Sequence, residues 1–433
     1  MKIALVAMSG LRVQNRRLQD LGLTLPGFIE RKKVIASLPS LGLLTLAGLT
    51  PNEFEVKYFE ISDYKNKDIN LHSFDIIAIS SFTAQIYEAY QLADEYRALG
   101  KTVVIGGLHA TACPNEAAQH ADSIFIGEAE VTWGKFLTDY KNGKIKSFYR
   151  GDEKDNVLKQ AVIPKYELLD IEKYNRITVQ TQRGCPFKCE FCASSIRLTP
   201  YYRQKPVESI LNEIDHIKSI WAQPFIEFAD DNSFVNKLLS KQLLRGLAPK
   251  KIKWFTETDI SVAEDDELLD LLVESGCRQL LIGFESPSSK QVTGIELKSN
   301  WKYRQADKYI NAIEKIQRKG ISVNGCFVLG LDTHRTDIFD EVEEFVNNSG
   351  LSDVQITLQT PFPNTELYHR LNAEDRLIKQ TFWDKCTLFD VTYIPKNMSI
   401  SELESGFEKL MKNLYTDDKV AKRRQLFLKN YRS

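Results

Sequence analysis

Three cysteines crowd into eight residues near the middle of the chain. Cys185, Cys189 and Cys192 have the spacing C-x3-C-x2-C. Three thiolates on one short loop can ligate three irons of a [4Fe–4S] cluster and leave the fourth iron open to another ligand. A zinc site or structural thiols are the alternatives, but structural zinc usually needs four Cys or His ligands, and no second C-x2–4-C pair exists here. An open iron indicates catalysis rather than electron storage.

Composition limits the function classes. The chain has 433 residues, with 57 Lys+Arg against 58 Asp+Glu and seven cysteines. A balance this neutral lacks the basic excess of nucleic-acid binders, and seven dispersed cysteines do not make a disulfide scaffold. The longest apolar stretch, Leu41–Leu49, is far below the roughly 20 residues that span a bilayer. We therefore expect a cytoplasmic protein without a transmembrane segment or a nucleic-acid partner.

The cysteine loop follows the first of six apolar runs that alternate with segments of helical period. We expect strands at 177–182, 224–229, 252–258, 279–285, 323–330 and 354–360, and helices at 206–219, 234–247, 265–275, 302–319 and 337–347. A full eightfold barrel typically needs about 250 residues, so 177–363 predicts a partial (β/α)6 barrel with its chemistry at the strand ends.

A second alternating series precedes it. Buried-strand runs at 2–9, 54–61, 75–82, 102–107 and 123–127, with helical segments at 84–99 and 131–140, predict a doubly wound α/β domain over 1–141. Its ligand site is expected at the carboxyl ends of the strands. The polar stretch 142–176 is interpreted as a linker. Residues 364–433 are interpreted as a helical C-terminal region whose basic end is a solvated helix.

The cysteine spacing and its position resemble the radical S-adenosylmethionine (SAM) enzymes over about 177–363. The resemblance implies that Cys185, Cys189 and Cys192 hold the cluster and that SAM chelates the open iron. One electron then cleaves SAM to methionine and a 5′-deoxyadenosyl radical. It implies no other catalytic residue that we can assign.

The resemblance also assigns SAM contacts at the strand ends. These are Asp230 and Asp231 for the methionine moiety, Glu257 and Glu285 near the ribose, and Gly325 and Gly330 around the adenine. Asp230 and Asp231 could instead cap the helix expected at 234, and Glu285 could be a solvated strand-end acid. Cys277 and Cys326, in apolar settings, are interpreted as core thiols.

Residues 1–141 resemble the cobalamin-binding domain of this group. The matching residues at strand ends are Ser81, Thr83, Gly106, Gly107, Gly127 and Glu128. Glycines let backbone approach a bulky flat ligand, and hydroxyls supply hydrogen bonds. The D-x-H-x-x-G pattern that places a histidine on cobalt is absent, because the loop after the first strand reads SGLRVQ over 9–14. His109 is interpreted as a loop or core histidine.

Together these resemblances imply a cobalamin-dependent radical SAM enzyme that methylates an unactivated carbon of a small-molecule or lipid-like natural product. Stretch 254–287 resembles members acting on hopanoid lipids. An electron donor such as flavodoxin or ferredoxin is implied. Alternatives are a ring-closing or rearranging enzyme, a degenerate domain without cobalamin, and a non-catalytic sensor. A methylthiotransferase is disfavoured, because its N-terminal domain carries three cluster cysteines and this one has only Cys113.

Overall fold

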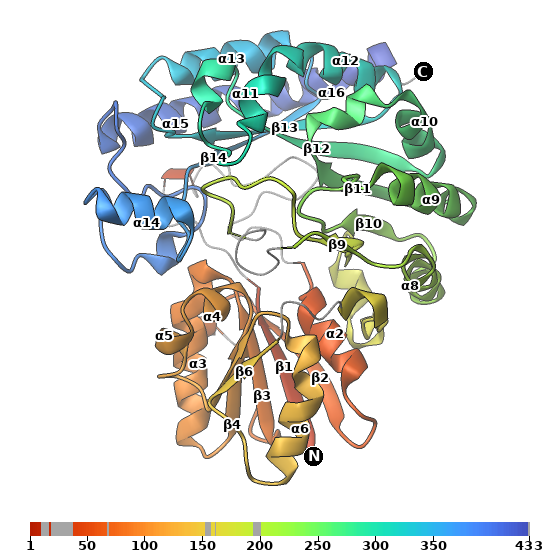
Figure 1. Ribbon diagram of the computed structural model, residues 1–433, viewed down its shortest axis with the longest axis vertical. Helices are drawn as coiled ribbons and strands as arrows, with labels where there is room; N and C mark the ends of the chain where they lie inside the picture. Colours follow the sequence, from red (N-terminus) through yellow and green to blue (C-terminus); the bar gives the residue numbers. More distant parts are fainter. Residues whose placement is uncertain are drawn as a thin grey trace. The chain divides into compact units, whose positions relative to one another are not determined.

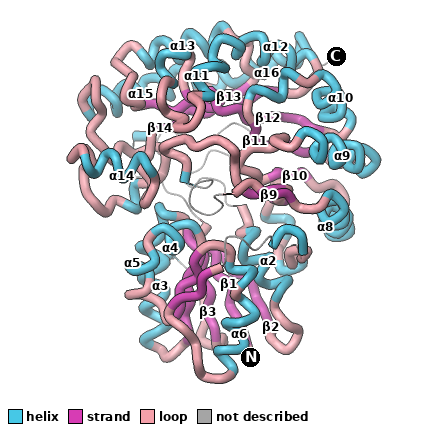
Figure 2. The backbone as a smooth tube through the Cα atoms, in the orientation of Figure 1, coloured by secondary structure: helices cyan, strands magenta, loops and turns pink. Residues whose placement is uncertain are grey.

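The computed structural model describes residues 1–9, 17–18, 38–66, 69–151, 157–160, 162–193 and 201–431. The chain divides into two compact units. Among the described residues, the first unit contains 1–9, 38–66, 69–151, 157–160, 162–184, 193 and 201–224, and the second contains 17–18, 185–192 and 225–431. Each unit contains a parallel sheet with helices packed around it (Figures 1 and 2). The unit boundary therefore falls immediately before the first cysteine of the cluster motif.

The first unit contains a six-stranded sheet in the order β2-β1-β3-β4-β5-β6. Its strands are β1 (Lys2–Met8), β2 (Glu55–Ile61), β3 (Ile76–Ser81), β4 (Thr102–Gly106), β5 (Ser123–Ile126) and β6 (Phe148–Arg150). All neighbours pair in parallel. The order reverses at β1 and β3, and such a switch point is where doubly wound sheets bind ligands.

Helices cover both faces of this sheet, as the apolar runs predict. The unit contains α2 (Leu41–Leu49), α3 (Ile86–Ala98), α4 (Leu108–Ala112), α5 (Pro114–Ala117), α6 (Trp133–Lys141) and α8 (Val207–Ile220). Trp133 and Phe136 of α6 pack on Phe125 of β5 with ring centroids 5.6 and 5.4 Å away. Trp133 is fully buried, and its indole Nε1 donates to Thr50 Oγ1 at 2.8 Å. This aromatic core supports the strand ends that carry the predicted cofactor residues.

The linker prediction for 142–176 is wrong in one place. Residues 148–150 form β6, which pairs with β5 through Phe125 and Tyr149. Tyr149 is buried in the core of the first unit, whereas its neighbours Phe148 and Arg150 are exposed. A strand of three residues, of which only Tyr149 is buried, is too short to show an alternating apolar pattern in the sequence. After β6, the described part of this stretch forms short 3-10 turns.

In the second unit, parallel strands lie side by side in the order β14-β13-β12-β11-β10. They are β10 (Phe225–Phe228), β11 (Lys253–Thr258), β12 (Cys277–Glu285), β13 (Ser322–Leu329) and β14 (Asp353–Leu358). With β7 (Ile177–Val179) in the first unit, strands form at all six predicted places. The helices of this unit's alternating part are α9 (Lys237–Leu247), α10 (Asp266–Glu274), α11 (Trp301–Gln305), α12 (Tyr309–Arg318) and α13 (Ile338–Asn348).

The start of α9 corrects one alternative from the sequence. Asn236 caps this helix, because its side chain accepts a hydrogen bond from the Leu239 amide at 3.2 Å. The helix therefore begins later than residue 234, and Asp230 and Asp231 do not cap it. The interpretation of these two aspartates as caps of this helix is therefore wrong.

The C-terminal region is helical, as predicted. It contains α14 (Glu366–Ala373), α15 (Ile400–Leu414) and α16 (Asp417–Tyr431), and α15 begins with a capping box between Ser399 and Glu402. The basic last helix is not wholly solvated, because Val420 and Phe427 are buried. Within the residues that the structure describes, no helix is both long enough and apolar enough to cross a membrane.

Gly276, directly before β12, provides a test of this unit's packing. It has φ +92°, and a Cβ there would lie 2.0 Å from the Ile252 carbonyl oxygen. We expect Gly276→Ala to lower the free energy of unfolding by more than about 2 kcal/mol, because backbone strain adds to a steric clash. Chemical denaturation of the cofactor-free protein measures this.

Gly294→Ala is the matched control. Gly294 also has positive φ, at +79°, but nothing lies within 4 Å of the Cβ position. We expect a loss of only about 1 kcal/mol from strain alone. Equal losses for the two variants would contradict the close approach at Gly276.

Candidate cluster and cofactor site

The cysteine loop is paired with a second segment of its own unit. The Glu190 amide donates to the Ile295 carbonyl at 2.9 Å, and the Leu297 amide donates to the Lys188 carbonyl at 2.8 Å. Between them, Cys189 and Glu296 form an antiparallel bridge. The middle cysteine therefore lies on a short extended strand that a partner segment holds in place.

Glu296 is the centre of this partner segment. Its buried carboxylate accepts five hydrogen bonds, from the amides of Lys188, Lys298, Ser299 and Trp301 at 2.8 to 3.2 Å and from the Ser299 hydroxyl at 2.8 Å. Burial alone would raise the pKa of Glu296, but these hydrogen bonds outweigh it and lower the pKa to about 2. Nothing in the local sequence marks this residue, because its donors are mainly backbone amides.

The three thiols fit a metal cluster. None forms a disulfide, and all are partly exposed. Burial raises the pKa of Cys185 to about 11 and also raises that of Cys189, and each thiol is further affected by the charge of Cys192. All three thiols belong to one stretch of eight residues, and iron would bind them as thiolates, so its binding would displace the protons that burial favours.

Two polar side chains act on the thiols, Asn232 on Cys185 and Lys302 on Cys189. Asn232 Nδ2 lies 3.8 Å from Cys185 Sγ, and the same amide is oriented by Asp259 Oδ2 at 2.8 Å. The positive charge of Lys302 opposes the rise in the pKa of Cys189. A hydrogen bond to sulfur and a nearby cation are both features that tune the potential of an iron–sulfur cluster. The sequence predicts no role for Asn232 or Lys302, because both are far from the cysteine motif in the chain.

Glu285 is brought to this region by a strained backbone. It has φ +64°, and its carboxylate lies 3.0 Å from Lys302 Nζ. Gly283 makes room for the pair, because a Cβ there would lie 2.6 Å from Glu285 Oε1. Burial opposes the charge on Lys302, but Glu285 outweighs it and raises the pKa of the amine. Glu285 is therefore a held, buried ion, not the solvated acid of the alternative interpretation.

Other predicted SAM residues form a group of acidic side chains at the strand ends. Solvent reaches the Glu257 side chain, but partial desolvation and then the charges of Glu227, Asp231, Asp230 and Glu285 raise its pKa to about 7. Asp230 is buried and accepts from Ser233 Oγ at 3.0 Å. Cys326 is partly exposed; burial and then the charges of Glu257 and Glu285 raise the pKa of its thiol, so its setting is less apolar than the sequence predicts.

The two predicted adenine glycines have packing roles. A Cβ at Gly325 would lie 2.8 Å from Leu351 and 3.1 Å from the Phe284 ring. At Gly330, with φ +90°, it would lie 2.1 Å from Tyr393 Oη, which donates to the Gly330 carbonyl at 2.6 Å. Only glycine fits at either position because of these neighbours. Any contribution to SAM binding would come from their backbone.

The carboxyl ends of β3, β4 and β5 in the first unit fit a large, partly apolar ligand. Thr83 is buried, and its Oγ1 has no hydrogen-bond partner among the described residues. Phe82 beside it is 55% exposed. Gly107 has φ +99°, and a Cβ there would lie 3.1 Å from Ser80 Oγ, whereas Gly127 faces open space. An unsatisfied hydroxyl, an exposed ring and bare glycines suit cobalamin and its nucleotide tail.

The remaining predicted cobalamin residues at these strand ends lie as follows. Gly106 ends β4, and a Cβ there would be 3.4 Å from the Phe125 side chain. Ser81 Oγ donates to the Phe82 carbonyl at 2.9 Å. The loop over 10–14 lies outside the described residues.

Glu128 has a different position from the one expected. Its carboxylate accepts from Arg183 Nη1 at 2.9 Å and from both terminal nitrogens of Arg203 at 2.8 and 2.5 Å. Arg183 and Arg203 lie on an antiparallel pair of strands, β8 (Gln182–Arg183) and β9 (Arg203–Gln204), and β8 ends two residues before Cys185. Glu128 therefore anchors these two strands.

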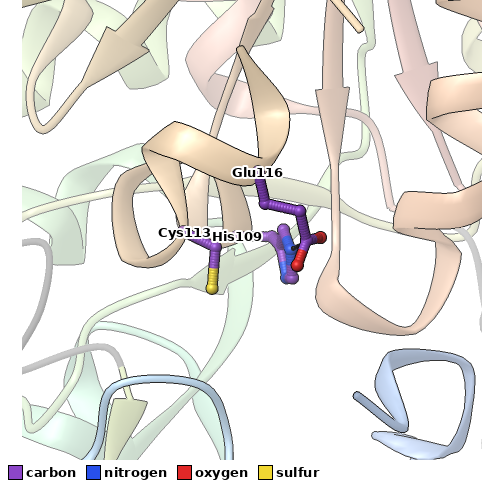
Figure 3. A group of neighbouring side chains, drawn as sticks. All are labelled: His109, Cys113 and Glu116. Carbon is purple, nitrogen blue, oxygen red and sulfur yellow. Dashed lines mark hydrogen bonds and ion pairs between the residues drawn. The ribbon is translucent and has the colours of Figure 1, made fainter. Parts of the chain in front are cut away.

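His109 on α4 lies near two other possible metal ligands, Cys113 between α4 and α5 and Glu116 on α5 (Figure 3). It is fully buried, and its Nε2 lies 3.2 Å from Glu116 Oε1, which also accepts from Tyr90 Oη at 2.9 Å. The carboxylate is thus engaged by two side chains of its own domain. This places His109 in a packed polar cluster of the first unit.

Three family models match the chain. They are the radical SAM superfamily at residues 179–347, the B12 binding domain at 32–136, and a domain of unknown function (DUF4070) at 365–433. The first covers the cysteine motif and the parallel strands β10 to β13, and the second covers the strand ends with Thr83 and Gly107.

Similar proteins include several named methyltransferases. The bacteriochlorophyllide d C-8(2)-methyltransferase of Chlorobaculum tepidum is 30% identical over 80% of this chain and 78% of that protein. An uncharacterized methyltransferase of Synechocystis is 29% identical over 79% of this chain and 65% of its own length. The hopanoid C-2 methylase of Rhodopseudomonas palustris is 24% identical over 80% and 66% of the two chains.

Solved structures show the same fold. The cobalamin-dependent SAM radical enzyme OxsB matches with a TM-score of 0.68 at 17% identity, over 94% of this chain and 65% of that chain. The radical SAM methyltransferase TsrM from Kitasatospora setae matches with a TM-score of 0.61 at 13% identity, over 86% and 75%. The chain belongs to the radical SAM superfamily. It falls in the group with an N-terminal B12 binding domain, so its cofactors are a [4Fe–4S] cluster, SAM and cobalamin.

Because the buried Thr83 hydroxyl has no partner among the described residues, removing it should have opposite effects on ligand binding and on stability. We expect Thr83→Val to weaken cobalamin binding about fivefold or more, since a hydrogen bond is lost. The same change should leave the cofactor-free protein as stable as before or slightly more stable, because an unpaired buried hydroxyl is removed. Spectroscopic titration with cobalamin and thermal denaturation measure the two effects.

Thr178→Val is the control, because Thr178 Oγ1 is also buried without a partner among the described residues but lies on β7. It should not change cobalamin affinity. Equal weakening by the two variants would contradict the placement of the ligand at Thr83.

Glu296→Gln tests the partner segment of the cluster loop. We expect lower iron content and lower stability, because an amide offers fewer acceptor sites to the five donors and adds donors of its own. The folded-state pKa is depressed, so the stability difference from wild type should be full above about pH 4.5 and vanish as the pH falls towards 2.

Denaturation of the apo-protein across this pH range measures the Glu296 contribution. Glu366→Gln is the control, since Glu366 pairs with Lys188 of the same loop but is 45% exposed. A stability difference that is independent of pH would show that Glu296 is not held as an ion.

Proposed function

We propose that this protein is a cobalamin-dependent radical SAM C-methyltransferase that acts on an unactivated carbon of a small-molecule or lipid-like natural product. The observation that carries the proposal is the pairing of two sites in one chain. One is a restrained three-thiol loop with a group of acidic strand-end side chains, and the other is a B12 binding domain with an unsatisfied Thr83 at its switch-point edge. Named methyltransferases among the relatives support this choice.

When bound, the cluster supplies an electron for the cleavage of SAM, and cobalamin carries the methyl group. The chain's own residues position these groups. Cys185, Cys189 and Cys192 hold the cluster, Asn232 orients the first thiolate, and Lys302 offsets the negative charge at the second.

The strand-end carboxylates are the proposed SAM contacts. Glu285 is fixed by Lys302 at 3.0 Å and suits hydrogen bonding to ribose hydroxyls, as a carboxylate held in one geometry. Asp231 is half-buried, and it is proposed to face the SAM ammonium group. Glu257, with a pKa near 7, can exchange a proton at neutral pH beside them.

The substrate and partners are proposed from the relatives and the composition. The relatives named above act, by name, on bacteriochlorophyllide d and on a hopanoid. The near-zero net charge of this chain likewise favours an apolar small molecule over a polyanion. A flavodoxin or ferredoxin is the proposed electron donor, and the cytoplasm is the proposed location.

Isotope transfer tests the proposed reaction. The anaerobically reconstituted enzyme, supplied with SAM carrying a CD3 group, a reductant and candidate substrates, should yield a product that contains CD3. A product of unchanged or hydrogen-depleted mass would replace methyl transfer with ring closure or rearrangement. Absence of SAM cleavage would overturn the enzyme assignment.

Cys189→Ala should abolish SAM cleavage and lower iron content, because one of three cluster ligands is lost. Cys277→Ala is the control, since Cys277 is buried in β12 and donates only to the Gln279 carbonyl. Full activity in Cys189→Ala would contradict the cluster site.

A further inference from the structure

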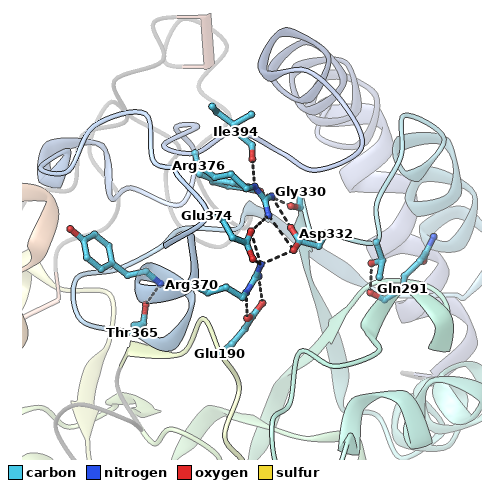
Figure 4. A network of polar contacts seen from close by, with 12 residues as sticks. Glu190, Gln291, Gly330, Asp332, Thr365, Arg370, Glu374, Arg376 and Ile394 are labelled. Carbon is cyan, nitrogen blue, oxygen red and sulfur yellow. Dashed lines mark hydrogen bonds and ion pairs between the residues drawn. The ribbon is translucent and has the colours of Figure 1, made fainter. Parts of the chain in front are cut away.

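The cluster loop also contacts the C-terminal region. Arg370 of α14 donates two hydrogen bonds to Glu190, from Nε to Oε2 at 3.0 Å and from Nη2 to Oε1 at 2.9 Å (Figure 4). Glu190 lies between the second and third cluster cysteines, and its side chain is 11% exposed. A two-point ion pair to a nearly buried carboxylate fixes both position and orientation.

Arg370 is itself held by a network around Asp332, which follows β13. Arg370 Nη1 donates to Asp332 Oδ2 at 2.7 Å, and Arg376 Nη2 donates to Asp332 Oδ1 at 2.7 Å. Glu374 bridges the two arginines, with Arg376 Nη1 at 2.7 Å (Figure 4). The Arg370 guanidinium is therefore held by Asp332 and Glu374 in an orientation that faces Glu190, so little further side-chain entropy is lost in making the pair.

Three more contacts join α14 to the same loop. The Leu367 amide donates to the Glu190 carbonyl at 2.9 Å, and Lys188 Nζ lies 2.9 Å from Glu366 Oε1. Phe191 packs against a cluster of buried side chains that includes Leu367 and Leu371. Backbone, charge and apolar contacts thus converge on residues 188–191, which separate Cys189 from Cys192.

We propose that α14, together with Arg376 just after it, holds the cluster loop in its ligating conformation, with Arg370 as the positioning residue. This gives a role to a region that matches a domain of unknown function. The inference rests on the cluster assignment and does not depend on methyl transfer.

The physical reason lies in the cost of ordering the loop. Fixing each residue of the loop in one backbone conformation costs conformational entropy, and without other restraints cluster binding would have to offset that cost for the whole ligating segment. Glu296 holds one side of the segment and α14 holds the other. When one iron–thiolate bond opens, a restrained loop keeps the thiolate close to the iron. The bond can then re-form, so the cluster is retained for longer.

Arg370→Met tests the proposal. We expect the cluster to be lost about tenfold or more faster on exposure to a chelator, as for other residues that support metal ligands. Hydrogen–deuterium exchange of the apo-protein should increase within 185–192, and the EPR signal of the reduced cluster should shift. Arg370→Lys should restore part of the effect, because it keeps the charge without the two-point geometry.

Arg424→Met is the matched control. Arg424 lies in the same region and pairs with buried Asp353 at 3.3 Å, away from the cluster loop. It should leave the exchange of 185–192 and the cluster lifetime unchanged. Equal cluster loss in both arginine variants would overturn the proposal, because the effect would then be general destabilisation of the C-terminal region.

A double-mutant cycle isolates the ion pair. Glu190→Gln and Arg370→Met should not be additive, so the double variant loses its cluster about as fast as either single variant. Additive effects would overturn the pairing. All of these readouts are independent of whether a methyl group is transferred.

Discussion

The structure depends on keeping three thiols on one short loop close enough to share a cluster. Mutual repulsion and burial disfavour their thiolate forms, and a flexible loop would separate them. The protein restrains the loop with a backbone bridge at Cys189 and Glu296, and with the ion pair from Arg370 to Glu190. Glu296 has a second effect, because it also fixes the backbone of residues 298–301. That segment leads directly to Lys302, whose positive charge acts on Cys189.

The two parallel sheets also bring together residues that are far apart in the sequence. Residues at the carboxyl ends of neighbouring parallel strands lie at one edge of the sheet regardless of their separation in sequence. In the second unit this edge gathers Glu257, Glu285 and Asp231. In the first unit it gathers Thr83, Gly107 and Gly127. Each unit thus presents one prepared edge, built on a buried apolar core.

Much of this could be predicted from the sequence. The cysteine spacing and the buried-strand runs reflect local periodicity and short-range motifs, so they indicated both α/β units and the cluster ligands. Strand β6 was missed because three residues show no period. Glu296, Arg370 and Lys302 were missed because their partners are backbone amides or residues far away in the chain. Gly325 and Gly330 were given cofactor roles, although their neighbours Phe284 and Tyr393 explain why only glycine fits.

The central claim is that one chain binds both a cluster and cobalamin in order to transfer a methyl group. Metal analysis of the anaerobically purified and reconstituted protein, combined with visible spectroscopy, tests it most directly. The account predicts about four irons and about one cobalt per chain, with absorption from both cofactors. Iron without cobalt, after reconstitution with excess cobalamin, would contradict the assignment of the first unit and remove the basis for methyl transfer.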